Sequence, residues 1–385
     1  MAPLSKYPWI CTGEDSPIQQ IGGKAANLLQ LRQVGQEVPP FYTVTAAAFQ
    51  HVMAHDGIDQ ATQSLVAMDK EPEIIQAAAN IRAAIANCNL PPELQQQVRN
   101  HHENIFVAEE YVAVRSSALD EDSAEKSFAG MHDSFLFVRG EDDILQAIRN
   151  VWASAFNERA VVYRLRSGLS LGQIVVAVVV QKMIDAARSG VIFTCNPGTN
   201  SVHQVVVSSL YGVGEGLVSA GLEADTFTVE KESLEFTSEI APKCEQLVLN
   251  TEQGGLKREA VPEALRVQSS LTDDEVRDVV RVAIRVEQHF GRPQDIEFCF
   301  DHKNRLFLLQ SRPVTNIEEN GPAAGNRLVW DNSNIVESYS GVTSPMTFSF
   351  IRRAYTIVYH CFAEVMGISP SKVRGWKEIT CTFRV

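Results

Sequence analysis

The chain has 385 residues, of which 45% are hydrophobic and 21% are charged, so it can bury a substantial core divided over two or three domains. Its formal net charge of -13 at pH 7 argues against a surface for non-specific nucleic-acid binding, and we expect no nucleic-acid partner. An anionic ligand would have to be met locally by a few Arg or Lys side chains.

Export and membrane signals are not evident in the sequence. Residues 1–15 contain no apolar run of signal-peptide length. The longest aliphatic run, IVVAVVV at 174–180, is far shorter than the ~20 residues of a membrane helix. We therefore predict a cytoplasmic protein with no membrane partner. Seven cysteines without CxxC or zinc-type spacing are predicted to be buried thiols in a reducing compartment: Cys11, Cys88, Cys195, Cys244, Cys299, Cys361 and Cys381.

The first half of the chain has mainly helical patterns. Residues 22–35, GGKAANLLQLRQVG, have apolar residues near helical spacing and a glycine at the end, which places Lys24 at a helix N-terminus. A short extended stretch and another helix follow, and residues 60–110 are helical with a break at Pro91 and Pro92. The run EYVAVRSSA predicts a short strand that ends at Arg115, and residues 142–168 predict one long amphipathic helix.

The second half has mainly strand patterns. Strands are expected in QIVVAVVVQKMI, SGVIFTCNP, HQVVVSSLYGVGEG, ADTFTVEK and PQDIEFCFDHKNRLFLLQSRPVT. One helix opened by Thr272 interrupts them, with acidic residues in its first turn. Successive strand pairs with inserted helices indicate an α+β fold, since regular βαβ alternation is missing from the pattern.

The last predicted hairpin joins DIEFCF to RLFLLQSR through the turn residues DHKN. Because side chains alternate along strands, one face would carry Asp295, Glu297, Gln310 and Arg312, and the other Phe298, Phe300, Phe307 and Leu309. The polar face has the oxygen ligands that Mg²⁺ prefers, beside a guanidinium suited to phosphate. The alternative interpretation is the solvated outer face of an edge hairpin.

Arg115 and Lys24 are the candidate phosphate ligands. Arg115 could form a surface ion pair with Asp120 or Glu121, or its planar guanidinium could bind a polyphosphate. Lys24 follows two glycines, but a Walker-type loop is rejected because Ile18 and Ala25 occupy positions that require Gly and Ser or Thr.

Two further segments qualify as ligand-binding elements. The sequence YGVGEG at 211–216 is a weak dinucleotide signal, because Leu217 replaces the third glycine, but it remains plausible as a flexible glycine loop near a ligand. Gln181 and Met183 end the aliphatic strand, where backbone groups and an adaptable Met side chain could meet an adenine. Met183 could equally be a core residue.

Taken together, six ordered segments resemble one family. They are IGGKAANLLQLRQVGQEVPPFYTVTAAAF, VAVRSSALDEDSAEKSFAGMHDSFLFV, VWASAFNERAVVYR, VVQKMIDAARSGVIFTCNP, SSLYGVGEGLVSAG and DIEFCF with LFLLQSRPVT. Over residues 20–315 the chain is similar to the N-terminal nucleotide-binding domain of phosphoenolpyruvate synthases, pyruvate phosphate dikinases and rifampicin phosphotransferases.

The resemblance implies an ATP-grasp-like domain that binds MgATP between two lobes, 1–170 and 171–315. Lys24 and Arg115 would contact the phosphates, and Glu297 and Gln310 would hold Mg²⁺ with Arg312 beside them. Gln181 and Met183 would lie at the adenine. The segment DEDSAEKSFAG, which ends at Gly130, would close over the phosphates and supply backbone N–H groups.

In such enzymes the phosphoryl group passes to a histidine on a separate domain and then to an acceptor such as pyruvate or another small molecule. None of the nine histidines here has the Gly-rich context of that carrier. We therefore expect the phosphohistidine domain elsewhere, either downstream on the same chain or on a separate chain, so that this chain is the front part of a longer enzyme or a stand-alone remnant. Residues 316–326 are expected to be a linker and 327–385 the start of a following domain, in which 330–355 resembles the start of the central domain of rifampicin phosphotransferase-like and some synthase-like proteins. The alternatives are a rifampicin phosphotransferase-like fragment, a non-catalytic ATP-binding regulatory module, or an ATP-grasp ligase that activates a carboxylate.

Overall fold

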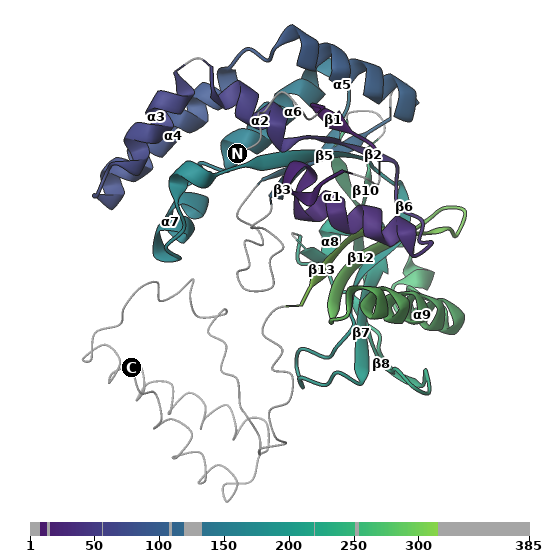
Figure 1. The fold of residues 1–385 in the computed structure, drawn as a ribbon. Helices are drawn as coiled ribbons and strands as arrows, with labels where there is room; N and C mark the ends of the chain where they lie inside the picture. Colours follow the sequence, from purple (N-terminus) through teal and green to yellow (C-terminus); the bar gives the residue numbers. More distant parts are fainter. Residues whose placement is uncertain are drawn as a thin grey trace, which may run out of the picture. The chain divides into compact units, whose positions relative to one another are not determined.

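The computed structural model describes residues 8–13, 16–55, 57–107, 110–118, 133–218, 220–250 and 254–314. The chain divides into two units at residues 318 and 319, inside the segment expected to be a linker. The first unit has an α+β fold, as predicted, with two antiparallel sheets and helices (Figure 1). Within the described residues, none of the helices has both the length and the hydrophobicity needed to cross a membrane.

The first sheet has five antiparallel strands. Their spatial order is β1 (Ile10–Cys11), β2 (Phe41–Val44), β5 (Val176–Lys182), β3 (Val112–Ala118) and β4 (Ser134–Val138). The helices whose apolar residues share its core are α2 (Ala46–Met53), α3 (Ile58–Val66), α4 (Glu71–Asn87), α5 (Pro92–Ile105), α6 (Glu141–Ser154) and α7 (Glu158–Arg166).

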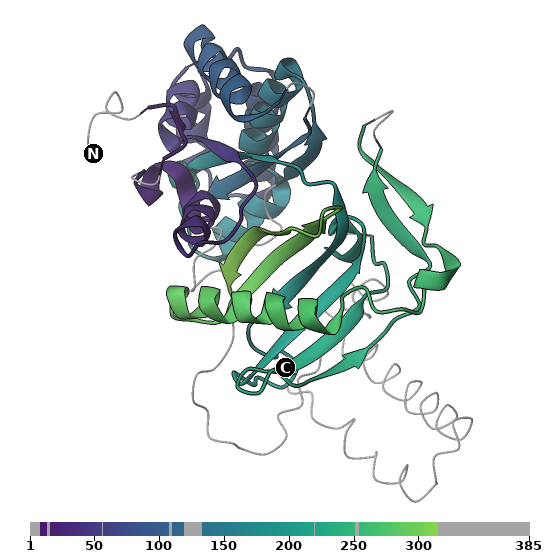
Figure 2. The same ribbon diagram turned by 90° about the vertical axis from the view of Figure 1, so that its right-hand side faces the viewer.

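The second sheet has six antiparallel strands. Their spatial order is β13 (Leu306–Pro313), β12 (Gln294–Asp301), β6 (Ala186–Phe193), β7 (Gln204–Tyr211), β8 (Asp225–Glu230) and β9 (Phe236–Glu239). Helix α9 (Asp273–Phe290) lies across this sheet, as Figure 2 shows, and buries Val276, Val280 and Val286. A separate hairpin consists of β10 (Glu245–Leu249) and β11 (Leu256–Ala260), and α8 (Glu215–Val218) is a single turn.

Strand β5 is covered on both faces, which explains its uninterrupted aliphatic sequence. Val176, Val178 and Val180 belong to the first core, whereas Val179 belongs to the core of the second sheet. Although residue 171 was the expected start of the second lobe, β5 pairs with β2 and β3. The change from one sheet to the other falls between β5 and β6.

Helix α1 (Ile18–Gln33) packs into the second core although it lies at the start of the chain. Its buried residues in that core are Ile21, Ala25, Ala26, Leu28, Leu29 and Leu31. Its Asn27 side chain donates a hydrogen bond to the carbonyl oxygen of Ser311 on β13, 2.9 Å away. The helix was predicted to start at the glycines, and the part after non-helical Gly22 agrees with that prediction. One more helical turn, which was not predicted, precedes Gly22.

Several sequence predictions need correction. The single helix expected over 142–168 is two helices, because the side chain of Asn157 accepts a hydrogen bond from the N–H of Ala160 and begins α7. Cys244 is exposed, unlike the buried thiols expected. Strands β4, β9, β10 and β11 were not predicted; β9 and β11 have mostly polar, partly exposed residues and little alternation.

A further correction concerns the hairpin of β12 and β13. The polar face is confirmed, since Asp295 pairs with Arg312 and Glu297 with Gln310. Phe298 and Phe300 enter the second core as expected, but Phe307 and Leu309 pack with Cys299 in another cluster. The register shifts between Glu297 and Phe298, and this β-bulge reverses the side-chain alternation of β13 from Leu309 toward the turn.

A buried ion pair joins the second sheet to the connection before α9. Asp225, at the start of β8, accepts hydrogen bonds from the Nζ of Lys243 and from the N–H groups of Ala241 and Ser270. The side chains of Asp225 and Lys243 are 0% and 1% exposed. Removal of one partner would leave the other charge buried without compensation.

We therefore predict that Asp225→Ala lowers the free energy of unfolding by about 3–5 kcal/mol, as measured by urea denaturation. The double variant Asp225→Ala with Lys243→Met should recover part of this loss. Glu245→Ala breaks the exposed pair of Glu245 with Arg258 and should cost at most ~1 kcal/mol, which makes it the control. Equal losses for Asp225→Ala and Glu245→Ala would contradict the assignment.

Candidate nucleotide site

A cavity of about 650 Å³ lies between the two sheets, and we call it the interlobe cavity. This volume is within the range of small-molecule and cofactor sites, roughly 300–1,000 Å³. Its lining includes seven of the residues expected at the site: Lys24, Arg115, Gln181, Met183, Glu297, Gln310 and Arg312. Gly130 lies outside the described residues. The fold thus gathers residues that are up to 288 positions apart, from Lys24 to Arg312, around one space.

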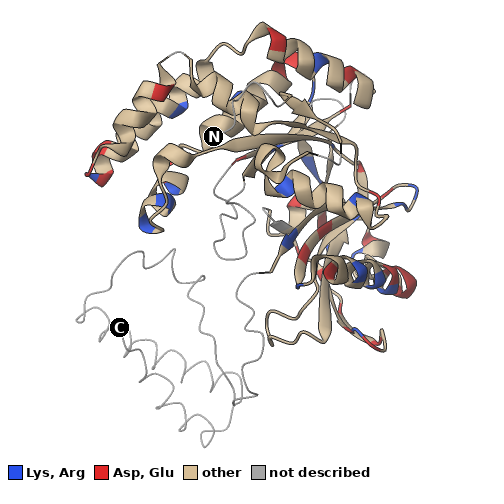
Figure 3. Ribbon diagram, in the orientation of Figure 1, with Lys and Arg blue, Asp and Glu red and all other residues tan. Residues whose placement is uncertain are grey.

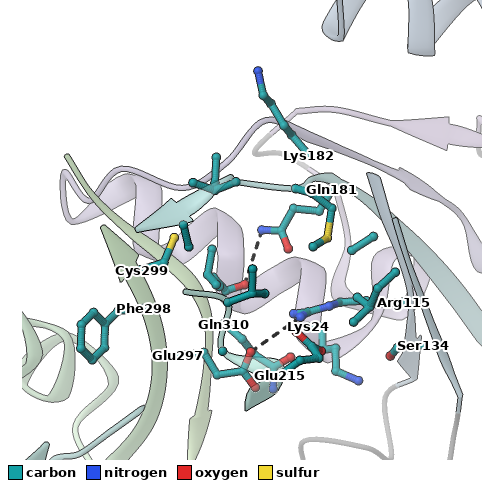
Figure 4. A pocket seen from close by; sticks show the side chains of 18 of the residues that line it. Lys24, Arg115, Ser134, Gln181, Lys182, Glu215, Glu297, Phe298, Cys299 and Gln310 are labelled. Atoms are coloured by element: carbon teal, nitrogen blue, oxygen red, sulfur yellow. Dashed lines mark hydrogen bonds and ion pairs between the residues drawn. The ribbon is translucent and has the colours of Figure 1, made fainter. Parts of the chain in front are cut away.

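Four cationic side chains line the interlobe cavity; Lys182 of β5 is paired with Glu110, and the other three come from three further elements. Lys24 comes from the first turn of α1 after the break at Gly22, Arg115 from the middle of β3, and Arg312 from β13. The strand predicted to end at Arg115 continues to Ala118. Figure 4 shows Lys24 and Arg115 close together, with Glu297 and Glu215 facing them. Three cations that line one cavity form a suitable site for a polyanion.

Arg115 contacts Glu297 across the interlobe cavity. Its Nη2 atom lies 3.7 Å from Oε2 of Glu297, and their side chains are 16% and 29% exposed. The strands that carry them, β3 and β12, belong to different sheets. Asp120 and Glu121, the ion-pair partners considered for Arg115, lie outside the described residues.

Asp295 holds Arg312 from the same face of the hairpin. Nε of Arg312 donates to Oδ2 of Asp295 at 2.9 Å, and Nη2 forms an ion pair with the same oxygen at 2.7 Å. Burial raises the pKa of Asp295, while Arg312 opposes that increase and Glu297 adds to it. Asp295 and Gln310 are both buried, so this face is not the solvated outer face considered as an alternative.

The other end of the lining is less polar. Gln181 is buried, and its Nε2 donates to the carbonyl oxygen of Leu309 at 3.4 Å. Met183 follows β5, and its N–H donates to the carbonyl oxygen of Tyr111 at 2.9 Å. Ile184 and Leu309 add aliphatic surface nearby. Figure 4 shows Gln181 apart from the group formed by Lys24, Arg115 and Glu297.

Glu215 is a lining residue that the sequence analysis did not select. It begins α8 within YGVGEG, which was considered only as a flexible glycine loop. Burial raises the pKa of Glu215; Arg115 lowers it and Glu297 raises it further. The sequence feature that could have identified Glu215 is its place as an acidic residue in a glycine-rich loop directly after a strand.

This fold and this cavity define an α+β domain in which a cavity of cofactor size, lined by cations and acids, lies between two antiparallel sheets. The chain belongs to the family described as pyruvate phosphate dikinase, AMP/ATP-binding domain, which matches residues 18–327. ATP binding is therefore a property of its family.

Known relatives agree with this assignment. The chain is 34% identical over 308 residues to a probable phosphoenolpyruvate synthase of Methanothermobacter thermautotrophicus, covering 77% of this chain and 44% of the relative. It is 33% identical to the phosphoenolpyruvate synthase of Escherichia coli, covering 77% and 40%. It is 32% identical to the rifampicin phosphotransferase of Bacillus subtilis, covering 79% and 35%. The chain thus spans less than half the length of each of these relatives.

The raised pKa of Glu215 gives a pH prediction. The folded state holds this proton more tightly than the unfolded chain, so its contribution to stability is full below the usual pKa of 4.5 and is lost as pH rises through the raised value. Glu215→Gln cannot ionise. Relative to wild type, its melting temperature should therefore be higher near pH 8 than near pH 4, as measured by thermal unfolding over a pH series.

The control for this measurement is Glu223→Gln, which changes an exposed glutamate in the same segment. Its melting temperature relative to wild type should stay nearly constant with pH. A constant difference for Glu215→Gln as well would rule out an ionisation penalty at Glu215.

Proposed function

We propose that this chain is the MgATP-binding part of a phosphoenolpyruvate synthase-like phosphotransferase, and that the phosphoryl group leaves ATP for a histidine on a separate domain. The observation that carries the proposal is the joint lining of one cavity by Lys24, Arg115 and Arg312 with Glu297 and Gln310. A site that only bound adenosine would not need three cations and these oxygen ligands.

The three cations would bind the phosphates. Planar guanidinium groups match the geometry of phosphate oxygens, and Arg312 is already oriented by a hydrogen bond and an ion pair with Asp295. Lys24 lies in the first turn of the helix after the break at Gly22, where backbone N–H groups also favour anions. The phosphates would therefore lie near Lys24 and Arg115, and the base near Gln181 and Met183.

Glu297 and Gln310 fit a magnesium ion because they are opposite each other in the strand register and offer oxygen atoms. Mg²⁺ takes oxygen ligands and completes its coordination with water and substrate phosphates. Held by Glu297 and Gln310, the ion would neutralise part of the negative charge of the phosphates.

The contact between Arg115 and Glu297 would be exchanged on binding. Each side chain has a role toward the ligand: the guanidinium toward a phosphate, the carboxylate toward the metal. Their present separation of 3.7 Å is long for a strong ion pair, so little attraction is lost when a nucleotide enters.

For the final acceptor of the phosphoryl group we propose a small molecule. Pyruvate is the acceptor considered first because relatives are named phosphoenolpyruvate synthases, and the rifampicin phosphotransferase relative supports another small-molecule acceptor. A regulatory module that binds ATP without transfer, or a ligase that activates a carboxylate, would be the alternative. Phosphorylation of a histidine domain would show phosphoryl transfer, which neither the regulatory module nor the ligase would carry out.

We predict different effects of Arg115→Ala and Glu297→Ala on ATP binding by titration calorimetry. Loss of the charged phosphate contact at Arg115 should weaken binding by about 1.5–3 kcal/mol with or without Mg²⁺. Loss of Glu297 should weaken binding mainly when Mg²⁺ is present. Arg258→Ala, which changes an exposed arginine paired with Glu245, serves as the control and should bind normally. Equal losses for both site variants in EDTA would remove the metal role from Glu297.

A second prediction concerns transfer. With ATP labelled at the β- or γ-phosphate, the chain alone should show only slow hydrolysis, because in-line attack needs a nucleophile within about 3–3.5 Å. Acid-labile label should appear after addition of a separately expressed histidine-carrying domain, and Lys24→Met should abolish it. Stable acid-labile label on the isolated chain would contradict the proposal, as would no label with the partner domain present.

A further inference from the structure

Helix α1 is interrupted just before Lys24. Gly22 has φ 74° and ψ 176°, which is outside the helical region, and helical geometry resumes at Gly23. A positive φ is accessible to glycine and strained for other residues. A Cβ atom at Gly22 would lie 1.7 Å from the carbonyl oxygen of Ser117, so the backbone of α1 lies directly against β3 at this point.

The hydroxyl group of Ser117 spans the interruption. It donates a hydrogen bond to the carbonyl oxygen of Ile21 at 2.7 Å, before the break, and accepts one from the N–H of Ala25 at 3.1 Å, after it. The N–H groups of a first helical turn have no partner within the helix. Ser117 therefore supplies from a strand what an N-cap residue normally supplies from its own helix.

We propose that Ser117 is a positioning residue for Lys24. The proposal rests on the proposed function, because the position of Lys24 matters only if its amine binds the phosphates of ATP. Ser117 fixes where the helix restarts, and Lys24 is the second residue after the break. The same hydroxyl thus sets the point from which the Lys24 side chain enters the interlobe cavity.

The geometry also links Lys24 to Arg115. Ser117 lies two residues beyond Arg115 on β3, so both side chains project from the same face of that strand. The Oγ atom of the intervening Ser116 is 3.5 Å from Nζ of Lys24. One strand therefore holds both candidate phosphate ligands, one directly and one through the start of α1.

Ser117 is not among the described residues that line the interlobe cavity, and it is 1% exposed. Its effect on a ligand must therefore pass through other residues. A purely structural serine would change stability alone, whereas a positioning serine would change ATP affinity in a way that depends on Lys24.

The test is a double-mutant cycle by titration calorimetry with MgATP. Ser117→Ala should raise the dissociation constant on the order of tenfold when Lys24 is present and should change it little in the Lys24→Met background. Ser209→Ala is the matched control: Ser209 is also fully buried, its hydroxyl pairs with that of Ser270, and neither serine lines the interlobe cavity. Ser117→Cys, of similar volume but with a weak hydrogen-bonding group, takes the place of the alanine variant if that variant does not fold.

Equal weakening in both Lys24 backgrounds would overturn the proposal, because Ser117 would then act independently of Lys24. A second readout does not need ATP binding: the NMR signal of ¹³C-methylated Lys24, identified by its loss in Lys24→Met. It should shift in Ser117→Ala and not in Ser209→Ala. If the wild-type chain bound no ATP, the proposed function would fail, and an unshifted Lys24 signal would separately overturn the positioning role.

Discussion

The packing of α1 against both sheets is the constraint on which the site depends. The apolar side of the helix completes the core of the six-stranded sheet, while its broken N-terminal part lies against β3 of the other sheet. Asn27 ties the same helix to the carbonyl group of Ser311, between Gln310 and Arg312. One helix thus fixes the relation between the strand that carries Arg115 and the hairpin that carries Glu297, so the width of the cavity is a packing property of α1.

Electrostatics in this protein are local. The chain is acidic overall, and Figure 3 shows Asp and Glu interspersed with Lys and Arg along α9, as expected for a solvated helix face. The lining of the interlobe cavity combines four cations, Lys24, Arg115, Lys182 and Arg312, with three acids, Asp133, Glu215 and Glu297. Asp295 pairs with Arg312, and Glu297 contacts Arg115. These acids offset the repulsion between the two arginines, which line the same cavity.

Much of this arrangement could be predicted from the sequence because the informative patterns were local. The alternation of side chains along β12 and β13 predicted the polar face with Glu297 and Gln310, and the helical spacing of apolar residues predicted α1. Phe307 and Leu309 were misplaced because a bulge depends on the pairing of two strands and leaves no mark in either strand alone. Glu215 was missed because its burial results from Arg115, Glu297 and the glycine loop coming together in space. The hydrogen bond between Ser117 and the N–H of Ala25 joins residues 92 positions apart, so a local sequence pattern could not have predicted it.

The position of α1 in the second core also has a consequence for biosynthesis. The helix is synthesised before β12 and β13, yet its hydrogen bond to Ser311 joins residues 284 positions apart, and its apolar neighbours in the second core include residues of those two strands. During synthesis its leucines must remain unburied, or be covered by other contacts, until those strands exist. Contacts of such sequence separation slow folding because a long loop must close first. The helix that aligns the cavity is therefore also an element whose packing waits for the last strands of the second core.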